Sequence, residues 1–327
     1  MKKVLSALLV FALSLGLLAA CGSAPAKEEP AAPKLRIVTT IFPIYDWVVN
    51  VLGEEAAGAE VTMLLDKGVD LHSYQPTADD LVRVSGCDLF VYVGGESDEW
   101  VSDALREAAN KNMAVIDLMD VLGDSVKEEE VVEGMEDEEE GGEDEEEEVE
   151  YDEHVWLSLR NAAVLCRAIA AALGQIDRDK AALYSANADA YIDKLNALDA
   201  QYQKTVEAGV HRTILFGDRF PFRYLADDCG LTYYAAFVGC SAETEASFET
   251  IIFLARKLDE LGLPAVMQIE SADGSIARTV VENTQAKDQQ ILTLDSMQST
   301  TGKDVAAGVS YLAVMEKNLD VLKAALG

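Results

Sequence analysis

Histidine, cysteine and positive charge are all scarce in this chain. Its 327 residues include only three histidines and five cysteines, and 26 Lys and Arg stand against 59 Asp and Glu, for a formal net charge of −33. Nucleic-acid binding needs clustered basic side chains to contact phosphates, and the sequence contains no such cluster. The cysteines show no CxxC or other close spacing, so they do not form a disulfide framework. Nucleic acid is therefore excluded as a partner.

Only one long hydrophobic run occurs, and it lies at the start of the chain. Two lysines precede the apolar residues 4–20, a pattern typical of a signal peptide over residues 1–20. The run ends in Leu-Ala-Ala-Cys, which resembles the lipobox of bacterial lipoproteins. This resemblance implies that Cys21 is lipidated and holds the protein on the membrane, with residues 21–33 as a tether. No other segment is apolar enough to span a bilayer.

The rest of the chain alternates short strand-like runs with helix-like stretches. Half of all residues are hydrophobic, and the length suits two lobes of about 100 to 150 residues each. Strand, helix, strand in repetition predicts right-handed crossovers and parallel sheets. We therefore expect an α/β fold of two lobes, 34–176 and 209–327, each with a mostly parallel four-stranded sheet flanked by helices. The expected strands are 35–40, 60–65, 88–93 and 113–117, then 213–216, 231–236, 265–270 and 290–294.

Two further segments have distinctive patterns. Residues 177–208 contain no proline or glycine, and their apolar side chains recur in steps of three and four. This predicts one backbone helix about 45 Å long between the lobes. Residues 127–150 are rich in Glu, Asp and Gly with almost no apolar side chain, which predicts a mobile acidic loop. Such a loop either concentrates cations near the protein or serves only as a solvated spacer.

Two of the three histidines lie in polar turns beside strand-like runs. His72 occurs in VDLHSYQPT and His154 in YDEHVWLS, while Asp218 and Asp295 each follow a strand-like run of the second lobe. Ligands collect beyond the carboxyl ends of parallel strands, so these four turns are expected to face one cleft between the lobes. Two imidazoles and two carboxylates suit Zn²⁺, or Mn²⁺ if the carboxylates bind through both oxygens. The predicted metal ligands are His72, His154, Asp218 and Asp295.

The chain resembles a known family at these residues and over nearly everything after the tether. The shared motifs include IVTTIFPIYDWV (37–48), the two histidine turns, IESADGSIARTVVENT (269–284) and the Leu-Asp-Ser turn. The family is the cluster A-I solute-binding lipoproteins of bacterial ABC importers for zinc and manganese. The resemblance implies two α/β lobes joined by a backbone helix. It also implies a non-enzymatic monomer, lipid-anchored on the extracytoplasmic face of the membrane, that captures Zn²⁺ or Mn²⁺ for a permease and its ATPase.

The resemblance also implies roles for single residues. His72 matches the first ligand, His154 the second, and Asp295 the carboxylate that follows the last strand. The chain departs from the family at Asp218, because zinc members place a histidine there and manganese members a glutamate. Glu270 is the expected substitute ligand or a partner that orients a histidine, and its other interpretation is a hydrogen-bonded structural acid.

Several residues each allow two interpretations from the sequence. Cys240 is either a soft ligand for zinc or a small packed side chain, and a disulfide between Cys229 and Cys240 is conceivable in an oxidising compartment. Arg219 pairs either with a cleft carboxylate or with a structural partner. His211 precedes its strand at the end away from the cleft and is expected to be exposed.

Two other classes of protein compete with the transport interpretation. A cell-surface zinc hydrolase usually keeps three protein ligands and a glutamate base near its histidines, as in HExxH. No HExxH occurs here, and Glu153 beside His154 is the only candidate base. An adhesin with a structural metal is the third class, and its cell binding would persist without the two histidines.

Overall fold

The computed structural model describes residues 34–135, 150–241 and 245–327. The expected signal peptide, the tether and the lipidated Cys21 lie outside the described residues, as do residues 136–149 of the acidic segment. Everything described below belongs to the unit Leu35–Gly327.

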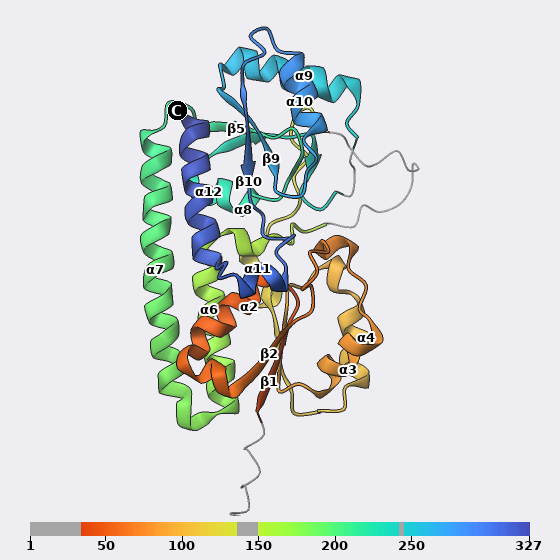
Figure 1. The fold of residues 1–327 in the computed structure, drawn as a ribbon, viewed down its shortest axis with the longest axis vertical. Helices are drawn as coiled ribbons and strands as arrows, with labels where there is room; N and C mark the ends of the chain where they lie inside the picture. The colour runs from red at the N-terminus through yellow and green to blue at the C-terminus, as the bar shows by residue number, and fades with distance from the viewer. Residues whose placement is uncertain (1–33, 136–149, 242–244) are drawn as a thin grey trace, which may run out of the picture. The chain divides into compact units, whose positions relative to one another are not determined.

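The first half of the chain builds one parallel sheet of four strands (Figure 1), as predicted. Its order is β2-β1-β3-β4, and Phe90 and Val91 in its centre are fully buried because helices cover both faces. The strands are β1 (Leu35–Thr39), β2 (Ala59–Met63), β3 (Leu89–Tyr92) and β4 (Ala114–Asp117). The helices between and after them are α2 (Phe42–Leu52), α3 (Ala78–Gly86), α4 (Trp100–Glu107) and α5 (Leu118–Leu122).

A long helix follows, also as predicted. Helix α6 (Leu159–Ile176) leads into α7 (Ala181–Ala208), which runs alongside both halves of the described chain in Figure 1. The 28 residues of α7 span about 42 Å at about 1.5 Å per residue. It starts at Ala181 rather than at residue 177, because Arg178–Lys180 form a separate 3-10 turn.

The second half contains the expected strands, but in shorter ladders. Parallel pairs form between β9 (Ala265–Ile269) and β10 (Gln290–Leu294) and between β5 (Thr213–Leu215) and β7 (Thr232–Tyr234). A parallel bridge between Phe216 and Met267 joins the two pairs. The sequence did not predict the two-residue ladder of β6 (Arg219–Phe220) with β8 (Phe237–Val238). The helices here are α8 (Arg223–Cys229), α9 (Phe248–Leu261), α10 (Ser275–Glu282), α11 (Gly302–Ala306) and α12 (Tyr311–Leu326).

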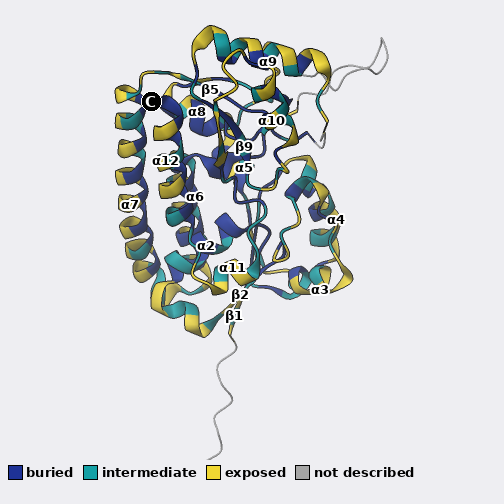
Figure 2. Ribbon diagram, turned by 45° about the horizontal axis from the view of Figure 1, so that its top comes forward, coloured by how far each residue is buried: buried dark blue, intermediate teal, exposed yellow. Residues whose placement is uncertain are grey.

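The buried core continues between the two halves. Figure 2 shows buried residues along the sheets and the inner faces of the helices. Tyr311 of α12 packs edge-on against Trp47 of α2 at 5.3 Å between ring centroids, and its hydroxyl donates to the Trp156 carbonyl at 2.7 Å. The indole of Trp156 donates to the Ser296 carbonyl at 2.9 Å. These contacts fix the segment that carries His154. They also tie the last helix to α2 in the first half of the chain, and the lobe boundaries 34–176 and 209–327 stay a prediction.

The described part of the acidic segment differs from the expected mobile loop. Backbone bonds join Glu129 to Glu150 and Asp152 to Lys127, each at 2.9 Å. Arg223 forms an ion pair with Glu130. Residues 127–135 are therefore held by a short ladder and by basic side chains, which their composition did not reveal.

Cys229 and Cys240 are both free thiols, so the conceivable disulfide is not formed.

Among the residues that the structure describes, no helix combines the length and the apolar character that crossing a bilayer requires.

The buried carboxyl of Asp46 leads to a prediction about stability. Its oxygen accepts from the Tyr191 hydroxyl at 3.1 Å, and burial raises its pKa from 3.8 to about 6. The unfolded chain loses this proton near pH 3.8 and the folded chain only near pH 6. The free energy of unfolding should therefore fall by up to about 3 kcal/mol across this window.

Asp46→Asn should remove the contribution of this carboxyl to the fall in the free energy of unfolding. Urea unfolding of both proteins between pH 4 and pH 7 measures it, and the variant should gain stability relative to the parent as the pH rises. Identical pH profiles would contradict the assignment.

Candidate metal centre

The first histidine is fixed by a short turn after β2. The 3-10 turn Leu71–Ser73 carries His72, whose backbone N–H donates to the Asp70 carboxylate at 3.1 Å. The ring Nδ1 lies 2.9 Å from Ser97 Oγ and 3.4 Å from Glu153 Oε2. These oxygens favour a proton on Nδ1, which leaves the lone pair on Nε2.

The second histidine is fully buried. The backbone N–H of His154 and its ring Nδ1 both lie against one oxygen of Asp152, at 2.8 and 2.9 Å. The Asp152 carbonyl in turn accepts from the Tyr224 hydroxyl at 2.7 Å. A carboxylate on Nδ1 is the arrangement that orients metal-binding histidines and increases the basicity of the other nitrogen. Nε2 of His154 is therefore the free donor.

The free nitrogens of the two rings point at each other. Nε2 of His72 and Nε2 of His154 are 3.2 Å apart, although the residues are 82 positions apart in sequence. Two imidazoles on one tetrahedral Zn²⁺, each at about 2.0–2.1 Å, have nitrogens about 3.3 Å apart. Burial, with a contribution from His154, lowers the pKa of His72 to about 3, so its ring is neutral at physiological pH, as metal binding requires.

A thiol completes the group. Sγ of Cys240 and the ring nitrogens of His72 and His154 all lie within 4.8 Å of one another. Within 34–135, 150–241 and 245–327, no other set of three His, Cys, Asp or Glu side chains meets this criterion. From the sequence, Cys240 was either a zinc ligand or a small packed side chain. The only local signal was Gly239 before it, which permits close approach of the backbone.

Asp218 is not one of the three side chains of this cluster, and its metal role stays a prediction. Its Oδ2 accepts from the Ile269 backbone N–H at 3.0 Å, and its Oδ1 accepts from the Arg219 backbone N–H at 2.9 Å. Burial raises its pKa above the ordinary value. Oδ2 thus joins the chain after β5 to the end of β9, while Oδ1 is used by the adjacent residue at the start of β6.

Asp295 and Glu270 are also used locally. Asp295 accepts from the Met297 backbone N–H at 2.8 Å, and burial, followed by the nearby Glu270 carboxylate, raises its pKa to about 6. Glu270 accepts from three backbone N–H groups, those of Ser296, Gln298 and Ser299, at 2.7 to 3.2 Å. These bonds match the interpretation of Glu270 as a hydrogen-bonded structural acid and give Asp295 a role in its turn, and the metal roles of both acids stay predictions.

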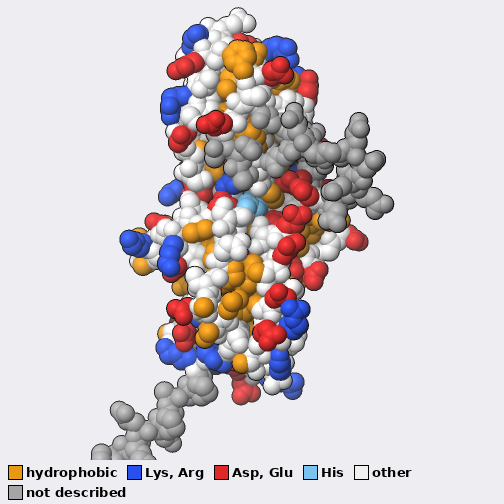
Figure 3. Space-filling view, turned by 90° about the vertical axis from the view of Figure 1, so that its right-hand side faces the viewer, with side chains coloured by type: hydrophobic (Ala, Val, Ile, Leu, Met, Phe, Trp, Pro, Cys, Tyr) orange, Lys and Arg blue, Asp and Glu red, His pale blue; other side chains and the backbone are white. Residues whose placement is uncertain are grey.

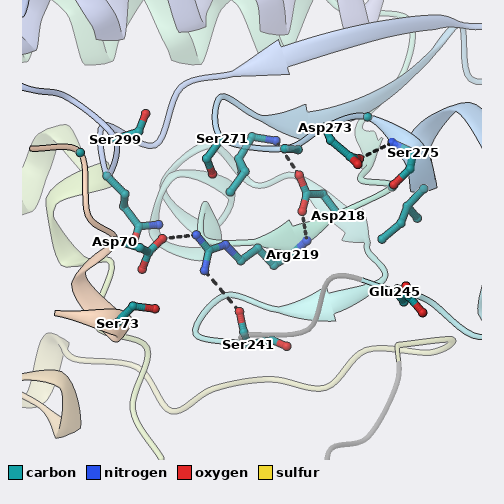
Figure 4. A pocket seen from close by; sticks show the side chains of 17 residues that line it. Asp70, Ser73, Asp218, Arg219, Ser241, Glu245, Ser271, Asp273, Ser275 and Ser299 are labelled. Carbon is teal, nitrogen blue, oxygen red and sulfur yellow. Dashed lines mark hydrogen bonds and ion pairs between the residues drawn. The ribbon is translucent and has the colours of Figure 1, made fainter.

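Arg219 links the turns that carry two members of the cluster. Its guanidinium pairs with Asp70, the residue that also caps the His72 turn, and donates to the Ser241 carbonyl at 3.3 Å (Figure 4). Burial is the largest influence on the pKa of Asp70 and acts to raise it, but Arg219 and His72 together hold that pKa below the usual value. The pair lines a cavity of about 540 Å³ that also contains Asp218.

A second cavity, of about 380 Å³, opens beside the histidines. His72 lines it, no Lys or Arg does, and five of its lining residues are glutamates: Glu96, Glu99, Glu129, Glu150 and Glu153. Figure 3 shows a histidine at the surface with acidic side chains gathered beside it. This negative field attracts cations toward the cluster.

His211 lies apart from this centre. It is half-buried rather than exposed, and its backbone N–H donates to the Leu326 carbonyl at 3.0 Å at the start of β5.

Two α/β halves that share helix α7 and present paired imidazoles between them define the class of cleft-type solute-binding proteins. The chain belongs to the family described as zinc-uptake complex component A periplasmic, which matches residues 37–325. This is a family of solute-binding transport proteins.

The chain is similar to curated and solved proteins from Streptococcus and Bacillus. It is 32% identical to the zinc-binding lipoprotein AdcA of Streptococcus pneumoniae over 99% of this chain and 61% of that protein. It is 29% identical to the high-affinity zinc uptake system protein ZnuA of Bacillus subtilis over 100% and 99% of the two chains. The Zn(II)-bound ZnuA-like domain of Streptococcus pneumoniae AdcA superposes with a TM-score of 0.69 at 29% identity, over 90% of this chain and 99% of that one. The chain spans about three fifths of the length of the AdcA relatives.

Proposed function

We propose that this protein captures Zn²⁺ outside the cytoplasm and delivers it to the permease and ATPase of an ABC importer. The observation that carries the proposal is the pair of free Nε2 atoms, 3.2 Å apart, each on a ring whose Nδ1 is already engaged. Two imidazoles held by their own neighbours, with their Nε2 atoms side by side, form a preorganised site for a divalent cation.

Relatives support zinc as the cargo. The curated relatives carry the names zinc-binding lipoprotein and high-affinity zinc uptake system protein, and the similar solved domain was described as Zn(II)-bound. The acidic cavity also supports a cation as the cargo, because its glutamates attract positive ions to the entrance of the cluster. Mn²⁺ is the alternative cargo.

The proposal includes the place and partners of the protein. Lipidation at Cys21 would hold it at the extracytoplasmic face of the membrane, as a monomer beside its permease. One relative of similar sequence is itself named a lipoprotein. Release of the ion would require the permease to separate the two histidine turns, since each ring is fixed by its own neighbours.

The hydrolase alternative depends on Glu153. This carboxylate accepts from the Ser97 backbone N–H at 2.9 Å and lies 3.4 Å from Nδ1 of His72, on the side of the ring away from the free nitrogens. There it orients the imidazole and is poorly placed to activate a water on the metal.

Metal analysis of the protein purified without added metal tests the proposal. We expect about one Zn²⁺ per chain, and competition titrations should show tighter binding of Zn²⁺ than of Mn²⁺. Cells that lack the gene should grow poorly under zinc chelation and recover when zinc is added.

Three outcomes would contradict the proposal. The first is a purified chain that binds neither ion. The second is zinc-dependent hydrolysis of ester or peptide substrates. The third is normal zinc uptake in the deletion strain combined with lost adhesion to host cells, which would favour the adhesin class.

A further inference from the structure

We propose that the Cys240 thiolate is the third protein ligand of the ion held by His72 and His154, so that the site has two nitrogens and one sulfur. This inference rests on the proposed function and specifies the chemistry of its site. It departs from the ligand set that the sequence indicated, in which Asp218 and Asp295 supply oxygen.

The first argument is convergence of donors. Sγ of Cys240 lies within 4.8 Å of the nitrogens of both histidines. For tetrahedral Zn²⁺ with bonds of about 2.3 Å to sulfur and about 2.0–2.1 Å to nitrogen, the sulfur and nitrogen atoms are roughly 3.6 Å apart. The observed cluster therefore needs only a small side-chain adjustment to hold the ion.

The second argument is the close approach of the backbone that carries the thiol. A Cβ on Gly239 would come within 3.1 Å of His154 Nδ1 and 3.0 Å of the Phe220 carbonyl oxygen. A larger residue here would force the imidazole or the Phe220 backbone to shift by a few tenths of an ångström, so glycine favours this close approach. The next residue, Cys240, is held by its backbone N–H, which donates to Glu129 at 3.1 Å.

The third argument is the bridge through Arg219. Its guanidinium pairs with Asp70, which caps the His72 turn, and donates to the carbonyl of Ser241, the residue after Cys240. Figure 4 shows the Arg219 guanidinium between Asp70 and Ser241, with a bond to each. The bridge sets the spacing between the turn of His72 and the turn of Cys240, while the neighbouring Asp218 is occupied by backbone amides.

A thiolate changes the preference of the site. Sulfur donors favour Zn²⁺, whereas Mn²⁺ prefers carboxylates, carbonyls and water. The site should therefore discriminate against Mn²⁺ more strongly than a site of histidines and carboxylates would. His72 and Cys240 both line the glutamate-rich cavity, from which water or a carboxylate could supply the fourth ligand.

Cys240→Ser in the purified full-length protein tests the inference, with Cys229→Ser as the matched control. Cys229 is also a free cysteine, but it lies in α8 outside the cluster. Cys240→Ser should lower Zn²⁺ affinity about 100-fold or more, beyond the effect of losing an outer partner. Mn²⁺ affinity should change much less. Co²⁺ loaded into the parent and the control should show a thiolate-to-cobalt charge-transfer band in the near ultraviolet, and Cys240→Ser should lack it.

The outcomes separate this inference from the proposed function. Tight Zn²⁺ binding by Cys240→Ser, with the charge-transfer band absent from the parent as well, would overturn the thiolate ligand and leave zinc capture in place. Failure of the parent itself to bind Zn²⁺ would overturn both. Cys240→His should restore much of the affinity through a third imidazole, and equal melting temperatures of all variants without metal would exclude misfolding as the cause.

Discussion

His154→Ala is expected to lower the Zn²⁺ affinity of the protein by roughly 100- to 1000-fold. Apparent zinc-binding free energies of about 10–16 kcal/mol, shared among four donors, amount to about 3 kcal/mol for each donor. His154 is fully buried with its ring fixed by Asp152, and the chain's third histidine, His211, lies outside the cluster and does not replace it. Isothermal titration with Zn²⁺ against a competing chelator measures the effect.

His211→Ala is the matched control for this loss. Its ring lies outside the cluster, and the backbone bond to Leu326 does not depend on the side chain. We expect the affinity of this variant to stay within about twofold of the parent. An equal loss in both variants, or no loss in His154→Ala, would show that the ion is bound elsewhere.

Glu270→Ala is expected to destabilise the fold by about 3 to 5 kcal/mol and to leave Zn²⁺ affinity nearly unchanged. The carboxylate accepts from the backbone N–H groups of Ser296, Gln298 and Ser299. Bonds to a charged group contribute about 1.5–3 kcal/mol each, and removal of the acceptor leaves these donors unpaired in a largely buried turn. Chemical denaturation of the metal-free protein measures the loss.

An exposed glutamate provides the control for Glu270→Ala. Glu316→Ala removes an exposed glutamate from α12 and should change stability by no more than about 0.5 kcal/mol. Little loss of stability combined with a large loss of Zn²⁺ affinity would show that Glu270 is a ligand rather than a turn former.

Local patterns in the sequence predicted the elements of this fold well. Alternating apolar runs indicated parallel strands, and the first sheet has the expected four. A proline-free and glycine-free stretch indicated the long helix α7. The ladder of β6 with β8 escaped prediction because each strand has only two residues, too few to show a period.

The metal centre was predictable in part. His72 and His154 stood out because polar turns after strands seldom need histidine for packing, and the structure brings their rings together. Asp218 looked equally suitable by the same rule. Its side chain is instead bonded to the Ile269 amide, which depends on how β5 lies beside β9. Such pairing between distant strands leaves no local signal.

The sequence alone determined the class of this protein, since periodicity, turn chemistry and family motifs are all local properties of the chain. Tertiary structure alone decided which donors converge. The carboxylates of Asp218 and Asp295 satisfy backbone amides, while the thiol of Cys240 reaches the imidazoles because Gly239 lets two segments approach closely. A side chain becomes a donor only where its neighbours leave its lone pair free, and those neighbours come from remote parts of the chain.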